Sequence, residues 1–327
     1  MYHINSMTTA TIVLAALAAL AAPLAAQEPQ CDALAFPNAR PACNTAVDAI
    51  RAFHPLAGMI VSGGNPVLGT ATSLGGIGHL TVTARVNAIK ASLPNPDSAS
   101  QSQVPSSFHG AIPAPIVEAA LGLLRGRGGF LSVDALGSAV LLPTSGASGL
   151  SVDSNAAHIG GAALGIGYGA RVGILGGTFP IPALSVSWMR RTLPRIQYGN
   201  LGPTFGTGDQ FEFSMDLKAD NYRAVASWKF VLVDLAAGIG VDHYSSSQTT
   251  IRFHDASTPT SVTTIVINPA NTREVAFVDG GLSLAALKLV AELGYQTGKD
   301  QHFTTNFSNF DPKAGHVFGG VGLRFGF

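Results

Sequence analysis

The sequence predicts an all-β fold, a closed antiparallel transmembrane β-barrel of about ten strands. Apolar and polar residues alternate with a period of two through one segment after another, which is typical of strands with one apolar face. No apolar run after residue 26 is long enough for a membrane helix. Of all residues, 46% are hydrophobic and only 12% are charged, whereas a soluble domain carries about 25% charged residues. A membrane barrel needs few charges because only its lumen and loops contact water.

The first 26 residues have the features of a signal peptide. An Ala- and Leu-rich run extends to Ala22 and is followed by Pro23 and by the small residues Ala25 and Ala26. The run is short for a bilayer span, and Pro23 interrupts it, so a membrane anchor is disfavoured. We therefore expect export of the chain and cleavage after Ala26.

Residues 27–71 have a different pattern, which predicts a separate segment: either a periplasmic one or a small plug at the lower mouth of the barrel. The two cysteines of the chain, Cys31 and Cys43, lie in this segment. In an oxidising periplasm they are expected to form a disulfide, and no His/Cys cluster completes a metal site around them. Helical spacing of apolar residues predicts a short helix over 45–53 that Asn44 caps and Pro55 ends.

Residues 72–327 contain the alternating segments and form the predicted barrel. One of these segments, Ile116–Leu124, fits a short helix as well as a strand with Glu118 pointing inward. The predicted strands cover residues 80–88, 116–124, 130–142, 157–175, 181–196, 210–229, 232–253, 262–284, 287–297 and 315–327.

The number of strands depends on residues 220–221. Before them Phe211 and Phe213 belong to the apolar set, and after them Tyr222 and Trp228 do, so the alternation changes phase. A β-bulge and a hairpin turn would each produce this change. With a bulge, all short turns fall at one end of the barrel and all long polar loops at the other, as in known transmembrane barrels. The bulge is favoured and gives about ten strands, with about twelve or fourteen as alternatives.

The last segment, residues 315–327, has an apolar face and a small or charged face, and the chain ends on Phe327. It resembles the closing strand of bacterial outer-membrane β-barrels, whose terminal Phe is read by the barrel-assembly machinery. The resemblance implies an outer-membrane location, contact with lipid, and Phe327 as the assembly signal. The Asn65-Pro66 step is similar to the N-terminal plug of FadL-type transporters of hydrophobic compounds. The outward apolar residues of this strand are Val317, Val321, Leu323, Phe325 and Phe327.

The alternation also predicts which charged side chains face the lumen. Both signs are present in similar numbers, and a narrow lumen favours ion pairs between them because unpaired buried charges are costly. The alternative is a constriction that selects solutes by charge. The lumen-facing candidates are Arg85, Glu118, Asp134, Arg171, Glu212, Asp216, Lys218, Arg223, Lys229, Asp234, Lys288, Glu292 and Arg324.

Three functions are compatible with these patterns. The first is a passive channel or transporter for small or hydrophobic solutes. The second is a non-conducting structural or adhesive barrel that acts through its outer loops. The third is an enzyme at the outer rim, since Asp242-His243, His254-Asp255 and His302 lie in predicted outer parts. Neighbouring residues of a strand point to opposite faces, so neither Asp-His pair forms a dyad.

The sequence contains no recognisable catalytic, metal-binding or nucleotide-binding motif. It therefore predicts that the protein is not an enzyme and needs no cofactor or metal. The formal net charge is +0, which gives no indication of a nucleic-acid partner.

Overall fold

The computed structural model describes residues 28–327 apart from 36, 98, 101–102, 127–129, 144–149, 154–157, 160–161, 179, 203–207, 259–260 and 285–286. The predicted signal peptide lies outside the described residues. None of the helices in this part of the chain is long and apolar enough to serve as a membrane span.

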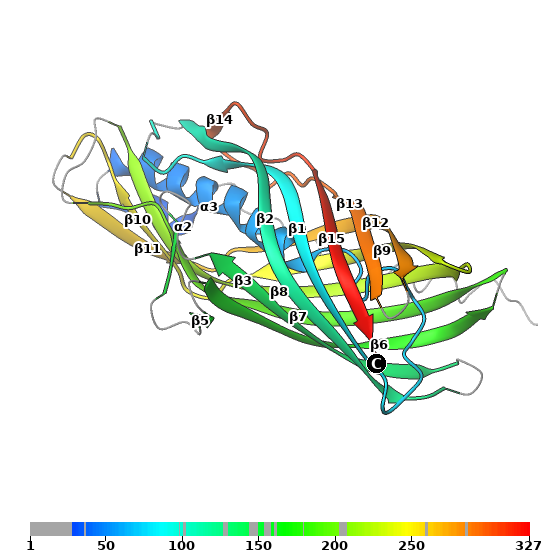
Figure 1. The fold of residues 1–327 in the computed structure, drawn as a ribbon. Helices are drawn as coiled ribbons and strands as arrows, with labels where there is room; N and C mark the ends of the chain where they lie inside the picture. The colour runs from blue at the N-terminus through cyan, green and yellow to red at the C-terminus, as the bar shows by residue number, and fades with distance from the viewer. Residues whose placement is uncertain are drawn as a thin grey trace, which may run out of the picture.

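Ten long antiparallel strands form a closed barrel, and the last of them pairs with the first (Figure 1). The closing register runs from Thr81 opposite Gly326 to Ile89 opposite Phe318. The fold class and the number of strands predicted from the sequence are confirmed. In the order of the ring, the strands are β1 (Leu80–Pro94), β2 (Gln103–Leu124), β3 (Ser132–Pro143), β6 (Ala162–Thr178), β7 (Ile181–Tyr198), β8 (Gln210–Lys229), β9 (Val233–Ser245), β12 (Ala270–Leu284), β13 (Leu287–Gln296) and β15 (His316–Gly326).

Shorter elements extend the barrel at the end opposite to the C-terminus (Figure 1). There β10 (Thr249–His254) pairs with β8, and β11 (Val262–Ile267) pairs with β10. β4 (Leu150–Val152) pairs with β7, β5 (His158–Ile159) with β6, and β14 (Asn306–Ser308) lies parallel to β2. We call this end the outer lobe: β4, β10, β11 and β14, the adjoining ends of β1, β2, β7 and β8, the helices they enclose, and the loop 297–315.

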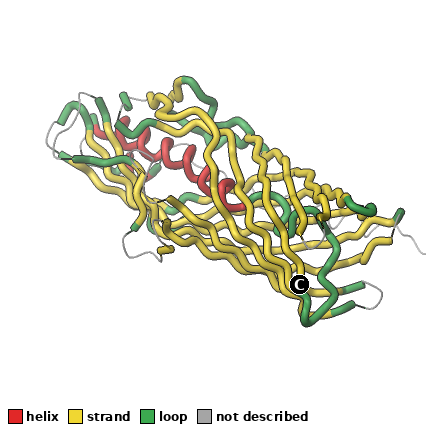
Figure 2. Tube along the Cα trace, viewed as in Figure 1, coloured by secondary structure: helices red, strands yellow, loops and turns green. Residues whose placement is uncertain are grey.

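The helices lie inside this lobe (Figure 2). α2 (Pro29–Asp32) is short, whereas α3 spans Ala39–Ser62 and contacts β1, β2, β8, β9 and β10. The prediction that Pro55 ends the helix is wrong, since α3 continues through it. Pro55 has no N–H for the carbonyl of Arg51, and the side-chain amide of Gln301 donates to that carbonyl instead, at 3.1 Å.

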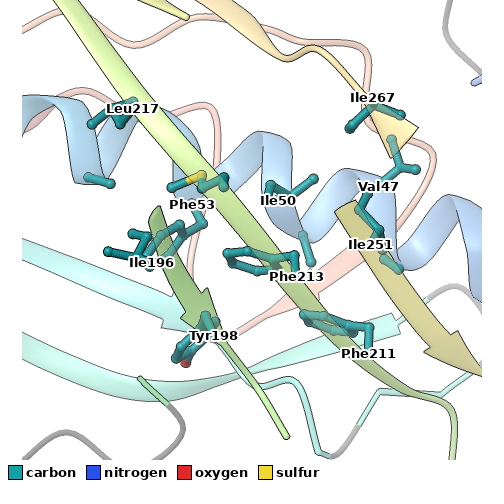
Figure 3. Close-up of a cluster of buried hydrophobic side chains, with 14 of the residues drawn as sticks. Val47, Ile50, Phe53, Ile196, Tyr198, Phe211, Phe213, Leu217, Ile251 and Ile267 are labelled. Carbon is teal, nitrogen blue, oxygen red and sulfur yellow. The ribbon is translucent and has the colours of Figure 1, made fainter. Parts of the chain in front are cut away.

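An apolar core fills the outer lobe around α3 (Figure 3). Phe53 of the helix stacks on Tyr198 of β7, with ring centroids 5.2 Å apart, and lies 5.1 Å from the ring of Phe213. The Tyr198 hydroxyl donates to the carbonyl of Pro94 at 2.8 Å, so its one polar group is satisfied. The core residues labelled in Figure 3 are Val47, Ile50, Phe53, Ile196, Tyr198, Phe211, Phe213, Leu217, Ile251 and Ile267.

Strand β8 corrects the interpretation of residues 220–221. It is one strand, but its pairing with β7 and β9 shows no register shift at these residues. The shift lies in β7, between Leu193 and Ile196, next to Pro194, which cannot donate a ladder hydrogen bond. The inner face of β8 is therefore continuous, and only its chemistry changes along the strand, from apolar in the outer lobe to polar below it.

The other half of the barrel has an apolar outer belt. Tyr222 is 52% exposed, Ile239 66% and Leu293 59%, all with their side chains on the outer face. Continuous exposed apolar surface around a closed barrel needs lipid as its surroundings. The protein is thus an outer-membrane β-barrel, with the short turns at the end of the C-terminus and the long loops in the outer lobe.

Candidate functional site

The lumen of the membrane half is occupied by residues 62–74, which we call the strap. The strap follows α3 and leads to the opposite end of the barrel, where the N–H of Leu80 donates to the carbonyl of Phe327 at 3.1 Å. It bends at Gly63, whose φ is +59°. A Cβ there would lie 2.8 Å from Nη2 of Arg85 and 2.9 Å from Nδ2 of Asn87, so only glycine fits.

Two charged wall residues hold the upper part of the strap. Arg223 of β8 donates from Nη2 to the carbonyl of Gly63 at 2.7 Å and from Nε to that of Gly64 at 2.8 Å. Glu292 of β13 accepts from the N–H of Gly64 at 2.9 Å and from that of Asn65 at 2.6 Å. The N–H of Gly63 donates to the carbonyl of Met59 in α3 at 3.4 Å. The two wall residues satisfy the carbonyls of Gly63 and Gly64 and the N–H groups of Gly64 and Asn65.

The lower part of the strap is bound by other strands. Asp279 of β12 accepts from the side-chain amide of Asn65 at 3.2 Å and also from the N–H of Gly69. Arg171 of β6 donates to the carbonyl of Thr72 at 3.0 Å. Arg324 of β15 donates to the carbonyl of Leu68. Wall residues from β6, β8, β12, β13 and β15 thus bind the strap from around the ring.

Buried charges of the lumen wall also pair with one another. Glu118 Oε1 accepts from Arg85 at 2.9 Å and from Arg191 at 2.8 Å. Arg223 lies 2.6 Å from Asp242, which also accepts from the Tyr244 hydroxyl at 3.0 Å. Each of these side chains is almost fully buried. Pairing and hydrogen bonding make buried charges tolerable, and removal of one partner would leave the other uncompensated.

One side of the lumen has buried polar atoms that no hydrogen bond within the described residues satisfies. They include Nε of Arg85 and Arg191, Oε2 of Glu118, both amide atoms of Asn87, and the hydroxyl of Ser138. All five side chains belong to β1, β2, β3 and β7. Buried polar groups of this kind bind water or a polar solute.

The loop 297–315 covers the outer end of α3. The carboxylate Oδ2 of Asp48 accepts from the N–H groups of Thr304 at 2.8 Å and Thr305 at 2.9 Å. On the other side of the helix, the disulfide between Cys31 and Cys43 joins α2 to α3. The lumen is therefore occupied at two levels, by α3 with its loop in the outer lobe and by the strap below.

The structure places most of the sequence-predicted lumen residues inside the barrel. The exceptions are Glu212, Asp216 and Lys218, which lie on the outer face of β8, and Lys229, which is exposed at the end of this strand. Glu212 pairs with Arg252 of β10 at 3.0 Å, and Asp216 accepts from Ser247. They face outward because this part of β8 belongs to the outer lobe, where water is outside and the apolar core inside. The predicted residues found inside are Arg85, Glu118, Asp134, Arg171, Arg223, Asp234, Lys288, Glu292 and Arg324.

Several lumen residues were not predicted. Asp242 and Asp279 follow the outward apolar residues Val241 and Val278, and the strand pattern could have identified them. Arg191 lies between Arg190 and Thr192, which give no such contrast. Asp242 was considered only as a neighbour of His243. Asn65 could not be found in this way, because no pattern in residues 62–74 indicates which wall they touch.

The rim histidines do not form a site. His243 contacts Thr272 on the exposed surface at 3.0 Å, His254 is buried at the end of β10, and His302 lies in the loop after β13. Within the described residues, no group of three or more His, Cys, Asp or Glu side chains is placed to hold a metal ion.

Comparison with known proteins agrees with the fold. No protein-family model and no curated protein matches the chain. The translocator domain of autotransporter NalP from Neisseria meningitidis is 12% identical with a TM-score of 0.43, over 85% of this chain and 97% of its own. The outer-membrane protease OmpT from Escherichia coli is 11% identical with a TM-score of 0.39, over 76% and 97%. The toluene transporter TbuX of Ralstonia pickettii is 9% identical with a TM-score of 0.20, over 82% and 92%.

At these identities the likeness concerns the fold alone. It nevertheless corrects the prediction that the protein is not an enzyme, since a protease is among the barrels that this chain is similar to. The absence of a sequence motif was a poor reason for that prediction, because catalytic groups are recognised by their geometry and need not be close in sequence.

Proposed function

We propose that the protein is a closed outer-membrane barrel that acts through its outer lobe. Its strap and α3 keep it from conducting. The observation that carries this proposal is the binding of the strap by wall residues from around the ring. This differs from the open passive channel that the sequence favoured first, and it corresponds to the second expected function, a non-conducting structural or adhesive barrel.

Dimensions and energetics support a closed lumen. A barrel of about ten strands has a narrow interior, and a helix with its side chains is about 10 Å wide. Opening would expose the apolar core around α3 and separate buried partners such as Arg223 and Asp242. Separating a buried ion pair costs several kcal/mol, on the order of 3–5.

The test is single-channel recording in a planar bilayer. We expect no stable conductance steps from the wild type, and steady steps from a variant that lacks residues 28–71. The closed barrel of each protein is verified by its resistance to unfolding in detergent. If the deletion variant does not fold, Arg223→Leu with Glu292→Gln provides a second way to release the strap. Steady conductance of the wild type would contradict the proposal.

A second candidate function is gated transport of small polar solutes. The unpartnered polar atoms of Arg85, Asn87, Glu118, Ser138 and Arg191 favour it, because they mark a polar side of the lumen next to the strap. A wild-type protein that is closed at rest but opens in steps under applied voltage would support this candidate over the first.

We also propose that the barrel-assembly machinery recognises Phe327. Its side chain is 74% exposed, and a lipid-facing Phe contributes only about 2–3 kcal/mol. Deletion of Phe327 is therefore expected to lower the outer-membrane yield far more than it weakens refolding in detergent. Phe327→Tyr is the control and should restore the yield. Normal assembly of the deletion variant in cells would show that the terminal aromatic residue is incidental.

A further inference from the structure

The two ends of the described chain lie at opposite ends of the barrel. The amide side chain of Gln30 bonds to the backbone of Val266 in β11, with its oxygen 3.1 Å from the N–H. Glu28 lies 3.0 Å from Arg51 of α3. Both contacts are in the outer lobe, whereas Phe327 and Leu80 pair at the other end (Figure 1).

The path between these ends runs through the lumen. α3 begins near β11 and ends at Ser62, whose hydroxyl accepts from Asn221 of β8 at 2.9 Å. The strap continues from there, bound to Arg223 and then to Asp279. At the far end the carbonyl of His79 accepts from the N–H of Gly122 at 2.9 Å. The N-terminal segment therefore passes along the length of the barrel before β1 begins.

The two ends of the barrel face different compartments. The C-terminal end has the short turns and the outer lobe has the long loops, which are the periplasmic and extracellular sides of an outer-membrane barrel. The outer face of β8 in the lobe is polar, as a surface in water requires. In this orientation residue 28 lies at the extracellular end, whereas the sequence predicted a periplasmic segment or a small plug at the lower mouth.

We propose that the N-terminal segment crosses the outer membrane through its own barrel, so that the mature N-terminus, expected at Gln27, lies at the cell surface. The lumen is the conduit for this one segment during assembly, and α3 and the strap close it afterwards. The bond of Gln30 to the edge of β11 holds α2 on the outer lobe, and the disulfide between Cys31 and Cys43 joins α2 to α3.

Residue 28 borders a recess at the surface of the outer lobe. A mainly polar recess of about 250 Å³ lies beside it, lined by Glu28, Gln30, Arg51, Val266 and Asn268 among others. Gln30 is itself exposed. The N-terminal end of the described chain thus lies beside a recess at the surface of the lobe, outside the apolar core.

The test is protease accessibility on intact cells. A short epitope with a protease site is inserted after Gln27 in one variant. Matched variants have it after Asn309, an exposed residue of the outer loop, or after Val231, which is 94% exposed in a turn at the C-terminal end. We expect added protease to cleave the sites after Gln27 and Asn309 at comparable rates. The site after Val231 should be cut only once the outer membrane has been permeabilised.

A second variant tests display directly. A small soluble domain without cysteines replaces the epitope after Gln27, and antibody binding to intact cells should detect it. Cleavage of the Gln27 site only after permeabilisation, like that of the Val231 site, would overturn the proposal. Because accessibility is measured independently of conductance, a conducting wild type would not affect this result.

Discussion

Strand β8 runs through both halves of the barrel, and the two halves use it in opposite ways. In the outer lobe its inner face carries Phe213, with an exposed fraction of 0%, and its outer face carries Glu212. In the membrane half its inner face carries Arg223, 4% exposed, and its outer face carries Tyr222, 52% exposed. The backbone phase is the same throughout. The alternation of apolar and polar residues therefore shows which face is in an apolar environment. It does not by itself show which face points into the barrel.

The inversion has a physical cause. Around the outer lobe, water lies outside, so apolar side chains gain free energy by packing inside against α3. Around the membrane half, lipid is as apolar as the side chains and gives no such gain, whereas polar groups must find partners in the lumen. Strand β1 shows the same change from a polar to an apolar inner face. Arg85 points inward in the membrane half and is 3% exposed, and Ile89 points inward toward the lobe and is 1% exposed.

Phe213→Asp is expected to have the largest effect. It removes an aromatic side chain from the core and buries a charge there, which together destabilise the outer lobe by more than about 5 kcal/mol. Limited proteolysis should cut the lobe while the membrane half stays folded in detergent. Phe213→Leu is the control and should lose only a small part of this stability. Equal resistance of the two variants to protease would show that the lobe core does not depend on an apolar inner face.

Arg223→Leu makes the opposite change on the same face of the same strand. It leaves Asp242 without its cation and the carbonyls of Gly63 and Gly64 without their donor. The free energy of unfolding should fall by about 3–5 kcal/mol. Urea unfolding followed by tryptophan fluorescence measures it. Asp242→Asn added to Arg223→Leu should recover part of the loss, because the uncompensated charge is then gone. A fully stable single variant would mean that the membrane half accepts an apolar lumen.

Much of the barrel was predictable because alternation, turn length and the closing strand depend on local sequence. The inward positions of Arg85, Asp134 and Arg171 follow from a register that neighbouring apolar residues set. Glu212 was misplaced because its apolar neighbours were assumed to face lipid, although the lobe continues beyond the membrane. The length of α3 was missed because the carbonyl of Arg51 is satisfied by Gln301, which is 250 residues away in sequence.

The strap could not be predicted for a related reason. Residues 62–74 have no periodic pattern, and their conformation is set by side chains of distant strands such as Arg223 and Glu292. Sequence patterns depend on the local environment, whereas the conformation of a segment bound by the lumen wall depends on the whole closed ring.

His54 allows a pH test of the outer lobe. Burial of this α3 residue lowers its pKa to about 4, opposed by a hydrogen bond to the Ser245 backbone and by Asp216, with His243 adding a small decrease. As the pH falls from about 6.5 to 4, the unfolded chain takes up a proton that the folded one does not, so stability is lost in this window. At pH 4.5 the loss is about 2–3 kcal/mol. Unfolding free energies at pH 7.5 and 4.5 measure it.

The matched variant is His54→Leu, which keeps an apolar side chain in the core and removes the titrating group. Its difference in stability between the two pH values should be smaller than that of the wild type by about 2–3 kcal/mol. If both proteins lose the same stability on acidification, other groups cause the pH dependence.

The smallest effect is expected from Arg252→Ala, which breaks an ion pair on the outer face of the lobe. Arg252 lies 3.0 Å from Glu212, and its side chain is 43% exposed, whereas that of Glu212 is 7% exposed. Glu212 keeps a second donor without Arg252, the N–H of Leu201 at 3.1 Å. Water and salt screen such a pair, and it contributes about 0–1 kcal/mol. The unfolding free energy of the variant should thus fall by less than about 1 kcal/mol, and by still less in high salt. Arg252→Lys is the control, since it keeps the charge. A loss of stability as large as that of Arg223→Leu would mean that the outer face of β8 in the lobe is not in water. The outer faces of the two halves would then not differ in the way described above.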